Sequence, residues 1–279
     1  MKFTKMQGTG NDFVVVDARD LARDWSKLAL AICDRHFGIG ADGLLLVRVS
    51  DDADLRMRMF NPDGSESEMC GNGIRCFVKY AIERNIAQPR NGGLTIETLA
   101  GVLTTVAFID DDRVESVRVG MGRPRFAPQE IPVLVEAEPP IKELPLEVDG
   151  ETLTVTCLSM GNPHAVQLID GPVDDYPLEV VGPQVERHSL FPNRTNFAVA
   201  RVLARDLIEA RVWERGAGAT LACGSGATAV MVAARLHDLV DESVEMRLPG
   251  GTLALEWDGE SDVYLTGPAV EVFEGEWPE

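Results

Sequence analysis

The chain has 279 residues and a formal net charge of −19, with 45% hydrophobic and 25% charged residues. This composition is typical of a globular protein and argues against nucleic acids or anionic membranes as partners, because both need a basic surface. No run of about 18 apolar residues predicts a membrane span, and no apolar segment of signal-peptide length opens the chain. Five cysteines without a Cys-x-x-Cys pair favour reduced thiols, so we expect a cytoplasmic protein.

Short β-rich runs, many of which alternate apolar and polar residues, predict the strands of the first half. These runs are Phe13–Val16, Leu44–Val49, Leu55–Phe60, Leu94–Thr98, Val102–Phe108 and Ser116–Val119. A small helix is expected at Ser26–Phe37, and the main helix of this half follows Cys70. Its amphipathic stripe consists of Ile74, Phe77, Val78, Ala81 and Ile82.

A Pro-rich segment, residues 124–145, joins the halves and contains little that favours a helix. The predicted strands of the second half are Leu153–Leu158, Val166–Ile169, Phe197–Val202, Ile208–Trp213, Val244–Leu248, Leu253–Trp257 and Val263–Thr266. The residues from Asp206 onward also allow a small helix. The main helix, Ala227–Ala234, is apolar on all sides except at Thr228, which predicts that strands surround it.

The two halves carry the same landmarks in the same order. Cys70-Gly71-Asn72-Gly73 and Cys223-Gly224-Ser225-Gly226 each open a helix, and their cysteines lie 153 positions apart (223 − 70). At offsets of 150 to 153, further matches join Gly10-Asn11 to Gly161-Asn162, Asp17 to Asp170, Arg35-His36 to Arg187-His188, and Gly101-Val102-Leu103 to Gly251-Thr252-Leu253. We therefore predict an internal duplication. The expected fold is α+β, with two pseudosymmetric lobes, each a curled, mostly antiparallel, barrel-like sheet around a central helix.

The paired cysteines suggest acid–base chemistry. Unpaired N–H groups and the helix dipole favour negative charge at a helix N-terminus, so a thiol there can lose its proton near neutral pH. Two such thiols, facing a shared cleft, could invert a stereocentre if one removes the α-proton and the other protonates the opposite face. The N–H groups of the Gly-rich turns would stabilise the substrate carboxylate in the carbanion-like state.

Other cysteine chemistries fit the sequence less well. Cys33, Cys76 and Cys157 are interpreted as small buried apolar residues. The ligand spacings and only four histidines argue against zinc, so no metal is expected. Redox dithiol chemistry usually shows a Cys-x-x-Cys pair, and a nucleophilic cysteine would need a partnered histidine, for which His164 and His188 are the candidates.

Taken together, the motifs resemble the diaminopimelate epimerase family. The matching segments are Gly8–Phe13, Phe60–Ser65, Cys70–Cys76, Gly161–His164, Arg194–Phe197, Trp213–Gly218 and Ala222–Gly226. The resemblance implies a PLP-independent enzyme that interconverts LL- and meso-2,6-diaminoheptanedioate in the pathway to lysine and peptidoglycan. It also implies a homodimer, and a C-terminal tail that returns to the first lobe. The expected lobes are residues 1–120 plus 268–279, carrying Cys70, and residues 121–267, carrying Cys223.

The resemblance also implies a role for each matching residue. Cys70 and Cys223 would be the two acid/base thiols, and His164 and Glu214 would tune them. The backbone groups that would bind the reacting carboxylate belong to Gly71, Asn72, Gly224 and Ser225. The side chains that would bind the amino and remote carboxylate groups belong to Asn11, Asn61, Asn162, Asn196, Glu214 and Arg215. Two positions depart from the family pattern: Ala219 replaces the usual Glu, and Gly43 stands where some members have Gln.

Two alternatives stay open. One is racemisation of another amino acid, such as proline, hydroxyproline or histidine. The predicted remote-end set disfavours it, because Asn61, Asn162, Asn196 and Arg215 suit a substrate with a second carboxylate. The other is a non-catalytic protein that binds a ligand, against which the presence of both cysteines argues.

Overall fold

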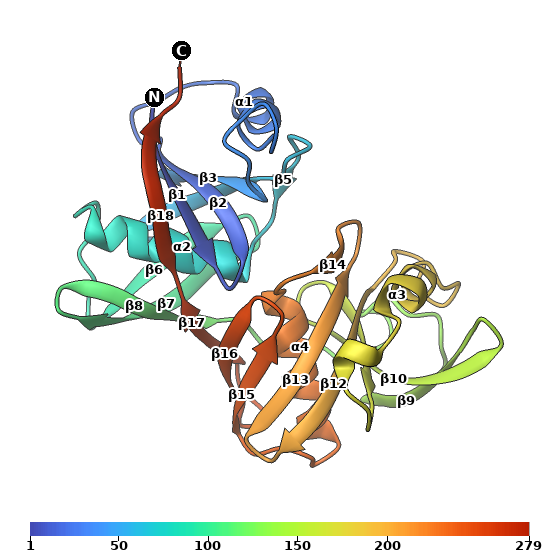
Figure 1. Cartoon of the computed structure of the whole chain (residues 1–279). Helices are drawn as coiled ribbons and strands as arrows, with labels where there is room; N and C mark the ends of the chain where they lie inside the picture. Colours follow the sequence, from blue (N-terminus) through green and yellow to red (C-terminus); the bar gives the residue numbers. More distant parts are fainter. Residues whose placement is uncertain (279) are drawn as a thin grey trace. The chain divides into compact units, whose positions relative to one another are not determined.

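The computed structural model describes residues 1–278 and divides them into two compact units (Figure 1). The first unit comprises Met1–Gly120 and the described residues from Thr266 onward, and the second comprises Met121–Leu265. Glu279, the last residue of the predicted C-terminal tail, lies outside the described residues. Both units combine curled sheets with few helices, which confirms the predicted α+β class. No helix within residues 1–278 is long and apolar enough to cross a membrane.

The first unit is mostly antiparallel. Its elements are β1 (Lys2–Gly8), β2 (Asn11–Asp17), α1 (Trp25–Ile32), β3 (Gly43–Arg48), β4 (Leu55–Phe60), β5 (Glu66–Ser67), α2 (Gly71–Glu83), β6 (Gly93–Thr98), β7 (Gly101–Asp110), β8 (Arg113–Gly120) and β18 (Val270–Glu276). β17 (Tyr264–Pro268) leads from the second unit back into the first. β1 pairs antiparallel with both β2 and β18. β2–β3 and β4–β6 are parallel pairs, whereas β3–β4, β6–β7 and β7–β8 are antiparallel.

The second unit repeats this order of pairing. Its elements are β9 (Ile141–Val148), β10 (Glu151–Ser159), β11 (Pro163–Leu168), the 3-10 helix η1 (Val173–Asp175), α3 (Leu178–Glu186), β12 (Asn196–Ala204), β13 (Leu207–Glu214), β14 (Gly218–Thr220), α4 (Gly224–Leu236), β15 (Ser243–Leu248) and β16 (Gly251–Glu256). β11–β12 and β13–β15 are the parallel pairs, and β10 pairs antiparallel with β9 and β11. The predicted duplication is therefore confirmed in the order of strands and helices. β1 of the first unit corresponds to β10 of the second. The partner of β1 is β18, and the corresponding partner of β10 is β9.

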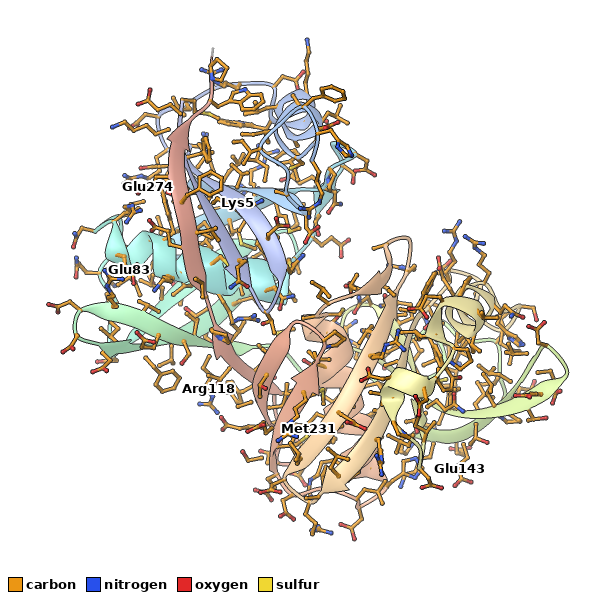
Figure 2. The ribbon with its side chains drawn as sticks, in the orientation of Figure 1. Lys5, Glu83, Arg118, Glu143, Met231 and Glu274 are labelled. Carbon is orange, nitrogen blue, oxygen red and sulfur yellow. The ribbon has the colours of Figure 1, made fainter. Side chains whose placement is uncertain are left out.

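Helices lie on both faces of the strands in each unit. α2 contacts β1–β4, β7 and β8, while α4 contacts β10–β13 and β16, as predicted for central helices. Every residue from Ala227 to Ala234 is buried, including Met231, which is labelled in Figure 2. On the other face, α1 packs Trp25 and Ile32 against β2 and β3. Because both faces of β2 are covered, its run Phe13–Val16 shows no polar alternation.

The predicted strands all overlap observed ones, but seven elements were not predicted: β1, β5, β9, β14, β18, η1 and α3. The helix expected at Ser26–Phe37 ends early, at Ile32, because the Asp34 side chain accepts hydrogen bonds from the N–H groups of His36 and Phe37 and forms a turn. The small helix considered from Asp206 onward is wrong. Those residues form β13, which is held between β12 and β15. The segment 124–140 contains no helix, as expected.

The close packing around α4 predicts that it will not accept a larger side chain. We expect Ala229→Leu to lower the free energy of unfolding by about 1–3 kcal/mol, because Ala229 is 0% exposed and overpacking forces neighbours to shift. The matched control is Ala31→Leu on the exposed face of α1, which should change stability by less than about 0.5 kcal/mol. Urea unfolding followed by circular dichroism measures both. Equal effects would contradict a strand-enclosed α4.

Candidate active site

Cys70 begins the central helix of the first unit. It is the N-cap of α2, with extended backbone (φ −142°, ψ 116°), and its Sγ accepts a hydrogen bond from the N–H of Gly73 at 3.4 Å. The thiol also donates to Oδ1 of Asn11 at 3.6 Å. Two predicted site residues are therefore in contact. Asn11 is the first residue of β2, and Cys70 is the N-cap of α2.

A charged network that the sequence analysis did not include holds Asn11. Nδ2 of Asn11 donates to Oδ2 of Asp42 at 2.8 Å. Arg35 bridges Asp42 and Asp12 at 2.7 Å each, and Lys5, labelled in Figure 2, pairs with Asp12 at 2.6 Å. Burial raises the pKa of Asp12, but the hydrogen bonds from Arg35 and Lys5 outweigh it and lower this pKa to about 2. The sequence signals for this network were the repeated Arg35-His36 landmark and the Gly8–Phe13 segment, which includes Asp12.

Asn72 and Gly71 lie at the start of α2, above a buried arginine. Arg75 is 0% exposed and donates to Oδ1 of Asn72 (2.9 Å), the carbonyl of Gly71 (3.2 Å) and Oγ1 of Thr9 (2.6 Å). Burial lowers the pKa of Arg75. A Cβ at Gly8 would lie 3.0 Å from Nη2 of this guanidinium, so a residue without a side chain suits that position. Arg75 therefore fixes the first turn of α2 and was missed by sequence reasoning.

Asn61 has local partners. Its Nδ2 donates to Oγ of Ser65 at 2.9 Å, and its backbone N–H donates to the carbonyl of Ser65 at 2.8 Å. The side chain of Asn61 thus closes the turn between β4 and β5. The hydrogen bonds of Asn61 do not connect it to Cys70 as those of Asn11 do.

Cys223 repeats the geometry of Cys70 in the second unit. It is the N-cap of α4 (φ −121°, ψ 116°), and its Sγ accepts from the N–H of Gly226 at 3.4 Å. Its Sγ lies 3.6 Å from Oγ of Ser225, which in turn accepts from Nδ2 of Asn162 at 3.3 Å. The structure thus brings together Cys223, Ser225 and Asn162. Cys223 is only 5% exposed, whereas Cys70 is half-buried.

The electrostatics at Cys223 differ from the expectation for a helix N-terminus. Burial raises its pKa well above the usual value, and the negative charge of Glu214 raises it further. The hydrogen bonds from Ser225 and the N–H of Gly226 lower the pKa but do not compensate. Glu214 is positioned by Thr220, whose Oγ1 donates to Oε1 at 2.6 Å. At neutral pH, Cys223 therefore carries its proton.

His164 is a neutral, buried side chain that contacts Asn162. It is fully buried, and its Nε2 lies 2.9 Å from Oδ1 of Asn162. Because an amide oxygen only accepts, Nε2 carries the proton, which leaves Nδ1 as an acceptor without a hydrogen-bond partner among the described residues. Burial, with a smaller contribution from the charge of Arg215, lowers the pKa of His164 to about 3. His164 therefore orients Asn162 and carries no positive charge at neutral pH.

Asn196 and Arg215 form a further contact among predicted residues. Oδ1 of Asn196 accepts from the backbone N–H of Arg215 at 2.8 Å, and its Nδ2 donates to the carbonyl of Pro163 at 3.0 Å. Asn196 is 3% exposed, so it connects the segments that carry His164 and Arg215 rather than facing solvent. Arg215 is exposed, and its Nη1 donates to the carbonyl of Asn193 at 3.0 Å.

The two departures from the family pattern have different surroundings. At Gly43, a Cβ would lie 3.1 Å from both Cε of Met59 and the carbonyl oxygen of Phe60, so a larger residue there would require these neighbours to shift by a few tenths of an ångström. Ala219 is exposed in β14 and pairs with Trp213. Glu214, in the preceding strand, is the carboxylate that acts on Cys223.

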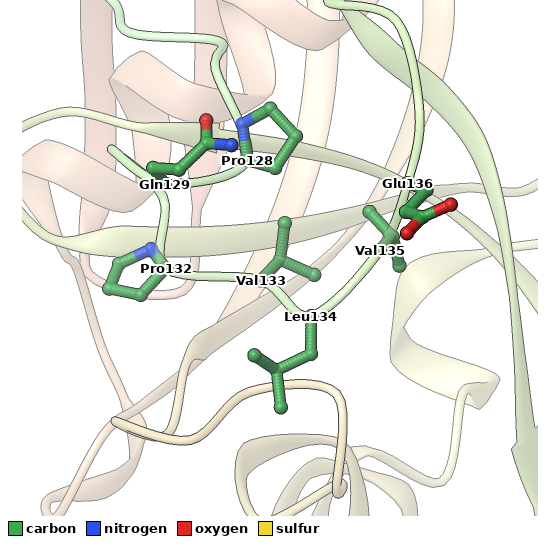
Figure 3. Close-up of a pocket in the computed structure, with 7 residues that line it drawn as sticks. All are labelled: Pro128, Gln129, Pro132, Val133, Leu134, Val135 and Glu136. Atoms are coloured by element: carbon green, nitrogen blue, oxygen red, sulfur yellow. The ribbon is translucent and has the colours of Figure 1, made fainter.

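The remaining cysteines and cavities do not suggest a second active centre. Burial raises the pKa of Cys33, Cys76 and Cys157 to about 12, in keeping with an apolar role. Within residues 1–278, no group of three or more His, Cys, Asp or Glu side chains could hold a metal ion. A surface depression of about 460 Å³ follows residues 128–136 (Figure 3). Its lining contains no thiol, and Glu136 is its only ionisable side chain: Pro128, Gln129, Pro132, Val133, Leu134, Val135 and Glu136.

Comparison with solved structures identifies the fold. The chain superposes on a Bacillus anthracis phenazine biosynthesis protein of the PhzF family with a TM-score of 0.72 and 19% identity, covering 100% of this chain and 99% of the other. It also superposes on a probable proline racemase from Agrobacterium radiobacter with a TM-score of 0.72 and 16% identity, covering 99% and 92%. At these identities, the likeness supports the fold alone.

Comparison with sequences is more specific. The family model described as diaminopimelate epimerase matches residues 3–127 and 156–272. The diaminopimelate epimerase of Moorella thermoacetica is 50% identical, with 100% of this chain and 99% of the relative covered. That of Methanococcus maripaludis is 46% identical over 99% of both chains. The chain therefore belongs to the diaminopimelate epimerase family.

Proposed function

We propose that this protein is a diaminopimelate epimerase that interconverts LL- and meso-2,6-diaminoheptanedioate without a cofactor, in the pathway to lysine and peptidoglycan. Cys70 and Cys223 act at the same α-carbon, one as base and the other as acid. The homodimer and the cytoplasmic location that the family resemblance implies belong to the same proposal.

One observation carries the proposal: the two cysteines share one local geometry. Each sulfur caps a buried helix and accepts a hydrogen bond at 3.4 Å from the glycine N–H three residues later. Glycine or small residues follow each sulfur, so a substrate carboxylate can approach the N–H groups of the first helical turn. Those N–H donors would stabilise the negative charge that develops when the α-proton leaves.

The surroundings of Cys70 and Cys223 differ in charge, which supports the idea that one thiol is protonated and the other ionised when the reaction starts. Glu214 and Asn61 occupy matching positions, each nine residues before its cysteine, but only Glu214 is ionisable. Burial and the carboxylate of Glu214 raise the pKa of Cys223, so this thiol would enter the reaction as the acid. Cys70 would then remove the first proton, and the reverse reaction would exchange the roles.

The remote end of the substrate would contact the second unit. Diaminoheptanedioate carries a second ammonium and a second carboxylate, and Arg215 is an exposed guanidinium suited to a carboxylate. Its backbone is held by Asn196, so this cation is presented from a fixed segment. The racemase alternative provides no use for such a group, and we therefore favour diaminopimelate as substrate.

Replacing either thiol tests the mechanism. We expect Cys70→Ser and Cys223→Ser each to reduce epimerisation at least about 10³-fold, because a serine hydroxyl is a far weaker base than a thiolate. The measurement is conversion of each diaminopimelate isomer, under reducing conditions in heavy water, with deuterium at the α-carbon read by mass spectrometry. Cys157→Ser, a buried thiol outside the proposed site, is the matched control. Near-normal turnover in either site variant would refute the two-thiol mechanism.

Removing the charge of Glu214 tests the assigned protonation. Because the carboxylate raises the pKa of Cys223, Glu214→Gln should lower it, and the pH profile of Cys223 alkylation should shift to lower pH. The rate of modification by iodoacetamide is measured by peptide mass spectrometry at pH values from about 6 to about 10. This range brackets the ordinary thiol pKa of about 8.5. Cys70 in the same samples serves as the internal control. A shift to higher pH would contradict the assignment.

The remote-carboxylate contact can be tested at Arg215. We expect Arg215→Ala to lower kcat/KM for diaminopimelate by roughly 10- to 100-fold, as for the loss of one charged hydrogen bond. Arg205→Ala, which removes another surface arginine that pairs with Asp241, should leave kcat/KM unchanged. A panel of free amino acids is assayed in parallel. If Arg215→Ala reduced turnover of a one-carboxylate amino acid as strongly, the racemase alternative would be favoured.

A further inference from the structure

A buried carboxylate outside the predicted site ends helix α3. The side chain of Glu186 is 3% exposed. It lies outside the segments that resemble the diaminopimelate epimerase family. Removing a carboxylate from water is costly unless hydrogen-bond donors compensate for the lost solvation. The position and partners of Glu186 therefore call for a physical explanation.

Donors from three places converge on this side chain. Oε2 accepts from the indole Nε1 of Trp213 at 2.8 Å, at the end of β13. Oε1 accepts from the backbone N–H of Gly216 at 3.2 Å and lies 3.5 Å from Nη1 of Arg194. Both carboxylate oxygens are therefore used. The two strongest contacts hold the residues on either side of the Glu214-Arg215 pair.

The backbone of Glu186 completes a closed circuit of hydrogen bonds. Its carbonyl accepts from the N–H of Thr195 at 3.1 Å, which fixes the start of β12. The next residue, Asn196, accepts from the N–H of Arg215 at 2.8 Å, and the N–H of Gly216 returns to the Glu186 side chain. Two consecutive backbone N–H groups, those of Arg215 and Gly216, are thus held by partners that both depend on Glu186.

Packing supports the same arrangement independently. A Cβ at Gly182, one turn earlier on α3, would lie 2.6 Å from the Cγ and Cδ2 atoms of Trp213. The indole therefore lies directly against the helix, and its N–H reaches Glu186 on the same helix. Any side chain at Gly182 would push the indole away from the carboxylate.

We propose that Glu186 is a positioning residue that fixes the backbone at Arg215 and so sets how well the protein recognises a substrate with a second carboxylate. This inference rests on the proposed function, which assigns Arg215 to the remote carboxylate. Glu186 does not touch the reacting atoms, so it should affect substrate binding more than the proton-transfer steps.

The variant Glu186→Gln separates charge and hydrogen bonding from size. An amide offers one acceptor oxygen and one NH2 group, so one of the donors from Trp213 and Gly216 would face another donor. We expect KM for diaminopimelate to rise about tenfold while kcat changes less than about threefold, as for loss of binding shared by ground and transition states. Amide hydrogen exchange at Gly216 should accelerate at least about tenfold, because its N–H loses a rigid partner, whereas the N–H of Arg215 keeps Asn196 and should change less.

Glu179→Gln is the matched control. Glu179 lies on the same helix and also pairs with a residue of β13, at 2.8 Å from Nη2 of Arg211, whereas the N–H of Gly216 is held by Glu186. Both KM and the exchange rates at Arg215 and Gly216 should stay at the wild-type values. If Glu179→Gln raised KM as much as Glu186→Gln, a general effect of α3 would explain the result and the proposal would be wrong.

A second variant covers the case in which Glu186→Gln does not fold. Trp213→Phe keeps a ring against Gly182 but removes the indole N–H, and it should raise KM in the same direction, by about threefold. If either variant folded but left KM and amide hydrogen exchange unchanged, the proposal would be overturned. A fall in kcat as large as the rise in KM would also overturn it. If the wild-type protein did not convert diaminopimelate at all, the proposed function would fail, whereas the exchange measurement would still test whether Glu186 holds this turn.

Discussion

The hydrogen bond from a glycine N–H to a cysteine sulfur, at the start of a buried helix, is the interaction on which the rest of this structure depends. It requires a cysteine in extended conformation, a glycine three residues later, and a helix whose N-terminus emerges from surrounding strands. The first two are set by short motifs. The third requires a whole unit of fold, because a helix as apolar as α4 is stable only when strands cover it on all sides.

Duplication supplies this arrangement twice and leaves room for the copies to diverge. The order of strands and the capping geometry are the same in both units, whereas the groups near each sulfur are not. Cys70 donates to Asn11, which a charged network holds, while Cys223 lies by Ser225 and is influenced by Glu214. An acid and a base need opposite protonation at the start of a reaction. Under the proposed mechanism, the neutral Asn61 and the acidic Glu214, at matching positions, would provide this difference in protonation.

Much of the fold could be predicted because its signals are local. The cysteine motifs, the repeated landmarks and the all-apolar helix at Ala227–Ala234 follow from sequence spacing alone. By contrast, the family resemblance implied that the C-terminal tail returns to the first lobe, but residues 270–276 do not themselves identify β1 as the strand with which β18 pairs. Helix α3 contains Pro183, which argues against a helix locally, and packing against β12 and β13 overrides that preference.

The same distinction between local and long-range causes holds for the candidate site. Motifs identify Asn11 and Asn196, and also Arg215, whose N–H bonds to Asn196. The residues that hold Asn11 and the turn after Arg215 were not predicted. Asp42 lies 31 positions from Asn11, Glu186 lies 30 positions from Gly216, and only the folded chain brings them together. These partners decide whether a polar side chain serves the fold or is available to a ligand. Asn196 illustrates the point, since its amide already uses one donor and one acceptor to join two segments, and what it can offer a substrate is the capacity that those bonds leave.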